Sequence, residues 1–408
     1  TLILLNRARL SNDATSLIEI LDDHRQFLGS SVVISGHNLT KGCWYSKFIL
    51  VTFTYCFCFP FMTSPRVTIK HVAQRAGVSV ATVSRVIRNY GYVHDKTRRK
   101  VLAAVRELGY HPNVIARSMV TKSTQTIGLV MTDIVNPFFA ELARGAESVA
   151  WSDGYTLVLA NTDEDVQREQ AIVSALVEKQ VDGLIIVPAS SRHAPHLYEV
   201  YHQQIPMVLV DRGVENLPVD TIMVDNEYAA YQAVSHLIEL GHRDIGMIMD
   251  NLDITTIAER LAGYRRALVE HGLTVSEERI QSCQYTMHSA YEITLKMLQG
   301  SPRPTALFTA SNFMTLGAIK AILDLGLKIP EDVALVGFDD LEWNHLFYPQ
   351  LTAVAQPVFE LGRVAAQRLL LRLKGEQSPS QEIRLKTTFI VRHSCGAHLH
   401  PEKCKENP

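Results

Sequence analysis

The chain has 408 residues, of which 47% are hydrophobic and 20% are charged, with 40 lysines and arginines against 42 aspartates and glutamates. These values are ordinary for a soluble globular protein, and the length suits two or three domains of roughly 150 residues each. The six cysteines show neither metal-binding spacing nor the pattern of a disulfide framework. This excludes a disulfide-stapled scaffold and makes a reducing cytosol the expected compartment.

The first 61 residues differ from the rest of the chain. They contain no methionine, and all ten methionines lie at Met62 or beyond. We therefore expect Met62 to be the true start and residues 1–61 to be translated upstream sequence or disordered. The competing interpretation is a membrane or targeting segment at the apolar run 48–61. That run is shorter than the roughly 18 residues of a span and contains Pro60, and bulky residues stand where a signal peptide needs small ones.

Residues 67–110 predict three short helices. Gly77 separates the first two helical patterns, and Thr68 and Ser79 are suited to cap them. Asp95 suits the positive start of the third helix. Two short helices joined by a turn, followed by a third, are typical of a helix-turn-helix, whose second helix enters the major groove of DNA.

Charge supports this interpretation independently. Residues 66–122 hold 12 lysines and arginines against two acids, Asp95 and Glu107, whereas the remainder holds 28 against 40. A near-neutral total thus hides a strongly basic module attached to an acidic body. Such a module suits a polyphosphate partner, because each neutralised phosphate releases counterions. A merely solvated basic face is disfavoured, since the charge coincides with the helical pattern.

Beyond a break at residues 111–113, Asn113 can cap a short helix that runs to about Val120, and residues 121–125 form a polar linker. From there short β-rich runs alternate with amphipathic helices. The predicted strands are 126–131, 155–160, 183–187, 206–210, 221–224, 244–249, 306–309 and 333–337. Strands that alternate with helices of this length predict parallel sheets, and their number predicts two of them. The expected fold class is α/β, with an N-terminal all-α headpiece and two doubly wound parallel-sheet subdomains.

The order and spacing of these elements resemble the lactose-repressor family of bacterial transcription regulators, whose body has a periplasmic sugar-binding fold. The resemblance covers about residues 66–396. It implies a headpiece at 66–111, a hinge helix and linker at 112–123, and an effector-binding and dimerisation domain at 124–396. Within that domain it implies an N-subdomain of about 124–224 plus 354–383 and a C-subdomain of about 225–353 plus 384–396. The tail 397–408 lacks apolar heptads, so a dimer is expected rather than a coiled-coil tetramer.

The resemblance assigns DNA contacts to the second helix. Residues 80, 81 and 85 lie near one face, which reaches base edges in the family. Arg85 can form a bidentate pair with guanine, whereas Val80 and Ala81 offer only apolar contact, for example to a thymine methyl. Nearby hydroxyls are suited to phosphates, which position the protein without specifying sequence. These hydroxyls belong to Ser79, Thr82, Ser84 and Thr97. Val83 and Val86 are expected in the core of the helix pair.

The short helix after Asn113 resembles the family's hinge helix, which forms on DNA, pairs with its dimer mate and wedges an apolar side chain into the minor groove. Leucine is the usual wedge, and this chain has Met119 in that place. Methionine also serves as a wedge, with a more flexible side chain.

Ligands of open α/β sheets bind at the carboxyl ends of the strands. By resemblance, the effector contacts at these ends are Asn136, Phe138, Phe139, Ser190, Arg260, Ser311, Asp339 and Gln356. Phe138 or Phe139 would stack on a sugar ring beside Asn136, and Arg260 and Asp339 would bind polar ligand atoms. The plainer alternatives are a surface charge for Arg260 and a loop cap for Asp339. Two places depart from the family pattern: Ser190 stands where some sugar binders carry a carboxylate, and Ser311-Asn312 stands where many members carry Asn-Asp.

The sequence therefore predicts a cytoplasmic DNA-binding transcription regulator, expected to repress a carbohydrate-utilisation operon. It would act as a homodimer on a palindromic operator under the control of a monosaccharide or derivative, with no cofactor, no metal and no membrane partner. An enzyme is disfavoured because the dinucleotide-binding, phosphate-loop and metalloprotease motifs are absent from the sequence. The alternative is a sugar-binding transport protein with the same body, against which the headpiece at 67–108 argues.

Overall fold

The computed structural model describes residues 67–88, 90–110, 123–346 and 348–399. The predictions for residues 1–61, for Asn113 and for Met119 lie outside these residues. Within them, no helix combines the length and the apolar character that a membrane span requires.

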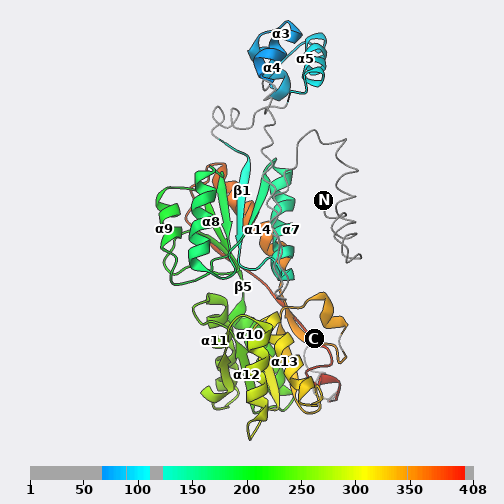
Figure 1. Ribbon diagram of the computed structural model, residues 1–408. Helices are drawn as coiled ribbons and strands as arrows, with labels where there is room; N and C mark the ends of the chain where they lie inside the picture. Colours follow the sequence, from blue (N-terminus) through cyan, green and yellow to red (C-terminus); the bar gives the residue numbers. More distant parts are fainter. Residues whose placement is uncertain (1–66, 89, 111–122, 347, 400–408) are drawn as a thin grey trace, which may run out of the picture. The chain divides into compact units, whose positions relative to one another are not determined.

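The headpiece consists of α3 (Ile69–Ala76), α4 (Val80–Arg88) and α5 (Asp95–Glu107) (Figure 1). Gly77 follows α3 with φ +64°, a left-handed conformation that glycine adopts without strain. Ser79 caps α4, because its Oγ accepts a hydrogen bond from the Thr82 amide at 3.2 Å. The three helices share a small apolar core. Its buried side chains are Val72, Ala73, Ala76, Val83, Val86, Val101, Ala104 and Tyr110. The predicted core positions Val83 and Val86 are thereby confirmed.

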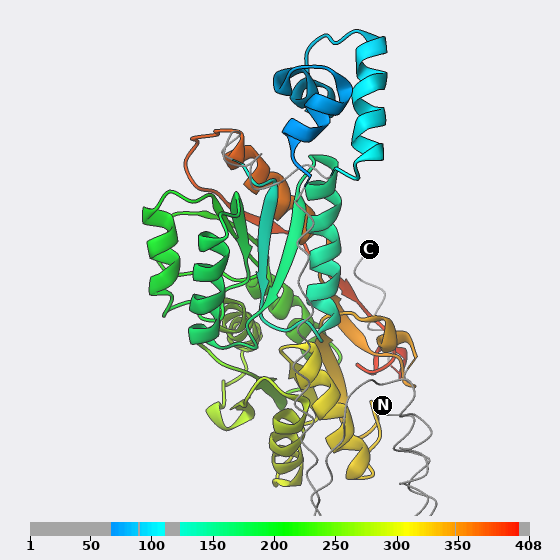
Figure 2. The same ribbon diagram turned by 45° about the horizontal axis from the view of Figure 1, so that its top comes forward.

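The first sheet has six parallel strands in the order β11-β5-β4-β3-β1-β2. Its strands are β1 (Thr126–Met131), β2 (Thr156–Asn161), β3 (Gly183–Ile186), β4 (Met207–Val210), β5 (Asp220–Val224) and β11 (Glu382–Leu385). Helices α7 (Pro137–Ser152) and α14 (Val358–Leu373) pack on one face. Helices α8 (Val166–Glu178) and α9 (Pro195–His202) pack on the other (Figures 1 and 2). Both faces are covered, which is why the central strands are apolar throughout.

The second sheet also has six strands, in the order β12-β10-β9-β8-β6-β7. They are β6 (Ile245–Met249), β7 (Ile280–Ser282), β8 (Ala306–Thr309), β9 (Ala334–Phe338), β10 (Thr352–Ala355) and β12 (Thr388–Ile390). Only the β10–β12 pair is antiparallel among the described strands of this sheet. Helices α10 (Asn226–Glu239) and α11 (Thr255–Glu270) cover one face, and α12 (Met287–Gln299) and α13 (Asn312–Asp324) cover the other. The predicted fold class is confirmed.

Two glycines set the close packing of α7 on α14. A Cβ atom at Gly145 would lie 2.0 Å from the Phe359 carbonyl oxygen, and one at Gly362 would lie 1.9 Å from the Leu142 carbonyl oxygen. The helix backbones therefore meet directly, and any side chain at either position would force them apart.

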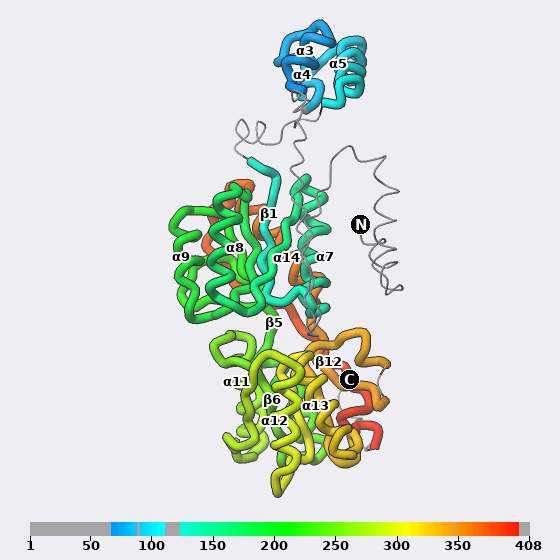
Figure 3. Tube along the Cα trace, in the orientation of Figure 1, coloured from blue at the N-terminus to red at the C-terminus, as the bar shows by residue number. Residues whose placement is uncertain are grey.

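The chain passes between the two sheets after β5, β10 and β11, as the tube in Figure 3 traces. This differs from the predicted subdomain limits at two places. Val354 and Ala355 belong to β10 of the second sheet, whereas the first subdomain was expected to resume at 354. Arg384 and Leu385 pair with Met223 and Val224 in the first sheet, whereas 384–396 was expected in the second. The two short strands β11 and β12 are nearly continuous in sequence, so their pattern carries no sign that they belong to different sheets.

Candidate effector site and DNA-contact surface

A small cavity of about 30 Å³ lies between the two sheet-containing subdomains. Its lining residues follow the carboxyl ends of strands in both sheets, where open α/β folds bind ligands. Seven of the eight predicted effector contacts line it, namely Asn136, Phe138, Phe139, Arg260, Ser311, Asp339 and Gln356. Seven residues that were not predicted complete the lining: Asp211, Arg212, Asp250, Ile254, Thr256, Ile257 and Tyr285. The volume suits about one water molecule, so a larger ligand requires the walls to move.

Ser190 is the exception among the predicted contacts, because it does not line the cavity. Its Oγ accepts hydrogen bonds from the backbone amides of Arg192, at 3.3 Å, and His193, at 2.9 Å. The hydroxyl therefore stabilises the turn after β3. A serine in a loop commonly bonds to nearby backbone in this way.

Asn136 connects the two subdomains. It caps α7, accepting at Oδ1 from the Phe138 amide at 3.0 Å. The same oxygen accepts from Nδ2 of Asn312 at 2.9 Å, and its own Nδ2 donates to the Tyr285 hydroxyl at 2.7 Å. Asn312 and Tyr285 belong to the second subdomain. One side chain thus caps α7 and links the two subdomains by hydrogen bonds.

Arg260 is buried, with 4% of its surface exposed, so it is not a surface charge. Its Nε donates to Oδ1 of Asn226 at 2.9 Å, and its Nη1 donates to the Ala310 carbonyl at 2.6 Å. The guanidinium lies 3.5 Å from the centroid of the Phe338 ring, a cation–π contact. Burial lowers the pKa of Arg260, against the opposing effect of Asp339, Asp211 and Asp250.

Asp339 performs the structural role that the plainer alternative gave it. Its Oδ2 accepts from the Asn312 amide, at 3.2 Å, at the start of α13, and its Oδ1 accepts from Nε2 of Gln356 at 2.7 Å. Its backbone has φ +77°, which is uncommon for residues other than glycine. Residues held in such conformations often lie at functional sites. Gln356 Oε1 and Ser311 Oγ are buried without a hydrogen-bond partner among the described residues. These two oxygens leave hydrogen-bonding capacity for a ligand.

Most of the charged residues that line the small cavity are among those that were not predicted. Arg212 forms a bidentate pair with Glu164, at 2.6 and 2.8 Å, and its Nε lies 3.4 Å from Oδ2 of Asp211. Burial raises the pKa of Asp211. Burial also raises the pKa of Asp250 to about 6, although Arg212 and Arg260 partly oppose the shift. The strand-end rule that selected Asn136 also points to Asp211, Arg212 and Asp250, whereas Tyr285 follows β7, which the sequence pattern did not reveal.

A second cavity, of about 580 Å³, adjoins the first. It shares Arg212, Asp250, Ile254 and Tyr285 with it, and its other lining residues are Glu164, Ala189, Asn251, Ser282, Cys283 and Gln284. A space large enough for a sugar-sized molecule therefore adjoins the small cavity.

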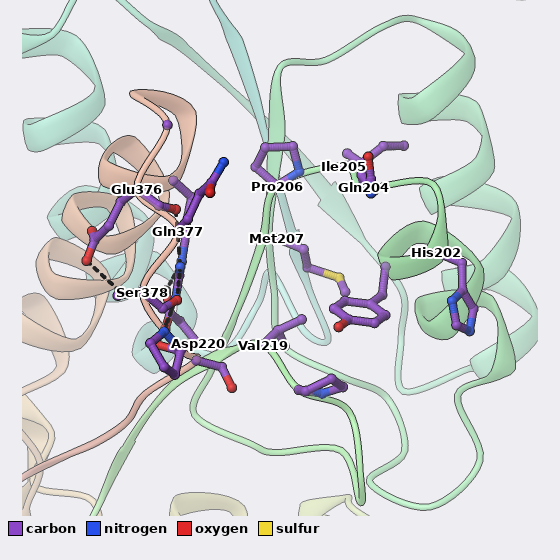
Figure 4. A pocket seen from close by; sticks show the side chains of 16 residues that line it. His202, Gln204, Ile205, Pro206, Met207, Val219, Asp220, Glu376, Gln377 and Ser378 are labelled. Carbon is purple, nitrogen blue, oxygen red and sulfur yellow. Dashed lines mark hydrogen bonds and ion pairs between the residues drawn. The ribbon is translucent and has the colours of Figure 1, made fainter.

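A further cavity, of about 840 Å³, lies at the amino ends of β4 and β5 (Figure 4). Its one aspartate, Asp220, is bound by Arg368 and Arg372, with N–O distances of 2.8 to 3.4 Å. These bonds lower the pKa of Asp220 although its burial opposes them. The network joins β5 to α14 and to the loop before β11, so we interpret it as structural.

In the headpiece, the predicted base-contact residues Val80, Ala81 and Arg85 are all exposed on α4. Among the predicted phosphate contacts, Ser79 is exposed, and Thr82, Ser84 and Thr97 are half-buried. The Oγ atoms of Ser79 and Thr82 lie 2.9 Å apart and bond to each other. One face of α4 thus presents an arginine beside two small apolar side chains.

A helix-turn-helix joined to a two-lobed body with a polar cleft defines a ligand-regulated DNA-binding protein. Residues 68–113 match the bacterial regulatory proteins of the lacI family, and residues 234–395 match the periplasmic binding protein-like domain. The chain is 37% identical over 327 residues to the HTH-type transcriptional repressor PurR of Aliivibrio salmonicida, which covers 80% of this chain and 98% of that protein. It is 36% identical to catabolite control protein A of Priestia megaterium, over 80% of this chain and 99% of that protein.

Solved structures agree with these matches. The lac repressor dimer bound to operator and the anti-inducer ONPF superposes with a TM-score of 0.73 at 28% identity, over 81% of this chain and 99% of that one. The transcriptional regulator CelR in complex with cellobiose gives a TM-score of 0.63 at 32% identity, over 81% and 100%. The chain therefore belongs to the lacI family of bacterial regulatory proteins. It is a DNA-binding transcriptional repressor and not an enzyme.

Proposed function

We propose that this repressor controls a carbohydrate-utilisation operon and responds to a monosaccharide or close derivative bound between its subdomains. The observation that carries the proposal is the position of Asn136, whose side chain caps α7 in one subdomain and bonds to Tyr285 and Asn312 in the other. A ligand that competes for these bonds changes the relation between the two halves of the body.

The lining supports a sugar. Phe138 and Phe139 supply aromatic surface beside Asn136, and buried polar atoms of Ser311 and Gln356 supply hydrogen-bonding capacity. This mixture suits a sugar, which has apolar ring faces and hydroxyl edges. Among the similar structures, CelR was solved with cellobiose, and a LacI family regulator from Enterococcus faecium, 28% identical with a TM-score of 0.60, was solved with ribose.

The proposed control is thermodynamic linkage. In this structure the small cavity holds only about 30 Å³, so a sugar seated beside Asn136 binds by replacing the Asn136 bonds or by separating the cleft walls. The ligand shifts the equilibrium by the difference between its affinities for the two arrangements and by no more than that. We propose that the shift reaches the operator through the linker of a homodimer.

On the DNA side we propose that the exposed face of α4 reads each half of a palindromic operator. Arg85 would recognise a guanine, and Val80 and Ala81 would contact apolar base edges such as the thymine methyl. Ser79, Thr82, Ser84 and Thr97 would contact phosphates, and Asn113 and Met119 keep the hinge roles assigned by resemblance. A cytoplasmic location follows from the access to DNA that this function requires.

A thermal-shift screen of neutral sugars, sugar acids and nucleosides tests the ligand class. A ligand at 100 times its Kd adds about 2.7 kcal/mol to the free energy of unfolding, which is readily measured. We expect a monosaccharide to stabilise the wild type and to lose that effect in Asp339→Asn, which keeps the residue's size but not its charge. Stabilisation by nucleosides alone, or equal stabilisation of both proteins, would reject the proposed ligand or the proposed site.

A further inference from the structure

The two cavities between the subdomains carry an excess of negative charge. The charged residues among those that line them are Glu164, Asp211, Asp250, Asp339, Arg212 and Arg260. Four carboxylates thus face two guanidinium groups, and the described lining contains no lysine or histidine. An anionic ligand entering this space would meet a net negative field in surroundings of low dielectric constant.

Both guanidinium groups also already bind groups of the protein itself. Arg212 is 6% exposed, and its two Nη atoms bind the two oxygens of Glu164, while Nη1 also donates to the Pro188 carbonyl at 3.2 Å. Arg260 is held by Asn226, the Ala310 carbonyl and the Phe338 ring. The planar, bidentate geometry by which arginine recognises phosphates and carboxylates is therefore taken at Arg212 by a carboxylate of the protein itself.

The backbone around Glu164 supports a dedicated role for this carboxylate. Asp163 and Glu164 have φ values of +54° and +58°, so two consecutive residues other than glycine are left-handed in the loop between β2 and α8. Such a conformation is uncommon for residues other than glycine and persists only where the surroundings fix it. This turn places Glu164 at the edge of the second cavity, in contact with Arg212.

We infer that Glu164 is an internal counter-anion that makes the effector site reject phosphorylated and carboxylated molecules in favour of uncharged ones. This inference rests on the proposed effector site and narrows the class of its ligand. Glu164 occupies the cation that a phosphate or carboxylate would need, and the remaining aspartates repel any anion that enters. A sugar phosphate or sugar acid is therefore excluded by charge even where its ring would fit.

The test compares Glu164→Gln with the wild type and with Asp163→Asn, a matched loss of one carboxylate in the same turn. Asp163 pairs with Arg168 and lines neither cavity, so its variant is the control. The probes are ribose, ribose 5-phosphate and inorganic phosphate, measured by isothermal titration. We expect Glu164→Gln to raise the affinity for ribose 5-phosphate or inorganic phosphate roughly tenfold or more, because it removes one facing charge and frees Arg212. The control should show no such gain.

The inference is wrong if the wild-type protein binds ribose 5-phosphate as tightly as ribose, or if it binds inorganic phosphate in the cleft. It is also wrong if Glu164→Gln and Asp163→Asn have equal affinities for these anions. The wild-type measurement stands even if Glu164→Gln folds poorly. If no neutral sugar binds at all, the proposed ligand class fails, whereas the inorganic phosphate titrations still decide the role of Glu164.

Discussion

The Nδ2 atom of Asn136 lies 2.7 Å from the hydroxyl of Tyr285, joining the amino end of α7 in one subdomain to the segment after β7 in the other. Burial raises the pKa of Tyr285 well above its usual value, so the hydroxyl stays protonated and forms a neutral hydrogen bond. Because the small cavity lies at this bond, the ligand binding proposed above would depend on the same atoms as the contact between the subdomains.

A double-mutant cycle with Asn136→Ala and Tyr285→Phe measures this bond. Tyr285→Phe removes only the hydroxyl, whereas Asn136→Ala also removes the helix cap and the bond to Asn312. We expect a coupling of about 0.5–1.5 kcal/mol in the free energy of urea-induced unfolding, the usual contribution of a neutral hydrogen bond. If the two losses simply add, the bond does not contribute to closing the cleft in solution.

The raised pKa of Asp250 predicts that the stability of the protein depends on pH. Its folded-state pKa is raised from 3.8 to about 6, so the folded protein binds a proton more readily than the unfolded chain between these values. The penalty for the buried charge is therefore present above about pH 6 and is relieved as the pH falls toward 4. Asp250→Asn should be more stable than wild type at pH 7.5, by of the order of 1–3 kcal/mol, with a smaller difference at pH 5. Chemical denaturation at both pH values checks this, and a difference that does not change with pH would contradict it.

The close packing of α7 on α14 predicts a large loss of stability on adding a methyl group. Gly145→Ala or Gly362→Ala places a Cβ about 2 Å from a carbonyl oxygen of the opposing helix, so the helices must separate. We expect each change to lower the free energy of unfolding by roughly 1–3 kcal/mol or more, as overpacking does. Gly213→Ala is the control, because its Cβ would meet nothing closer than 3.8 Å. Equal melting temperatures for all three variants would show that the helices do not meet so closely.

We expect substitution of Arg85 to reduce the discrimination between DNA sequences. Arg85→Ala should cost about 1–3 kcal/mol on the operator and relax the preference for one guanine in each half-site. Arg75 is a matched control, since it lies in α3 and its Nη2 is 2.7 Å from the Glu107 carboxylate. Binding to operator variants, measured by fluorescence anisotropy, distinguishes the roles. Equal losses on specific and random DNA would make Arg85 a phosphate contact.

Strands with apolar cores were predictable from the sequence, because burial on both faces leaves a short apolar run between helices. All eight predicted strands are present, within two residues at either end. The assignment of Leu385 failed because sheet membership depends on pairing with Val224, 161 residues earlier, which no local pattern encodes. β7 was missed for a related reason: its side chains are only partly buried at an edge of the sheet, so they show no apolar run.

In the candidate site, too, local sequence pattern was informative and long-range contacts were not predictable. Residues such as Asn136 and Asp339, which stand at the ends of recognisable strands, were predicted to be near one another and line one cavity. The Glu164–Arg212 pair was not predicted, because it depends on a left-handed turn at Glu164 and on a contact across 48 residues. Ser190 does not line the cavity, since its hydroxyl bonds to its own turn.

We propose above that a small molecule bound beside Asn136, Arg260 and Asp339 sets the affinity for DNA. The most direct measurement is the operator Kd of the whole chain, with and without the saturating ligand found by thermal shift, for wild type and Asp339→Asn. The proposed linkage predicts that the ligand changes the wild-type Kd by about fivefold or more, the range of typical allosteric coupling, and changes the Kd of the variant far less. An operator Kd that does not respond to a ligand the wild type demonstrably binds, or a full response in Asp339→Asn, would contradict it.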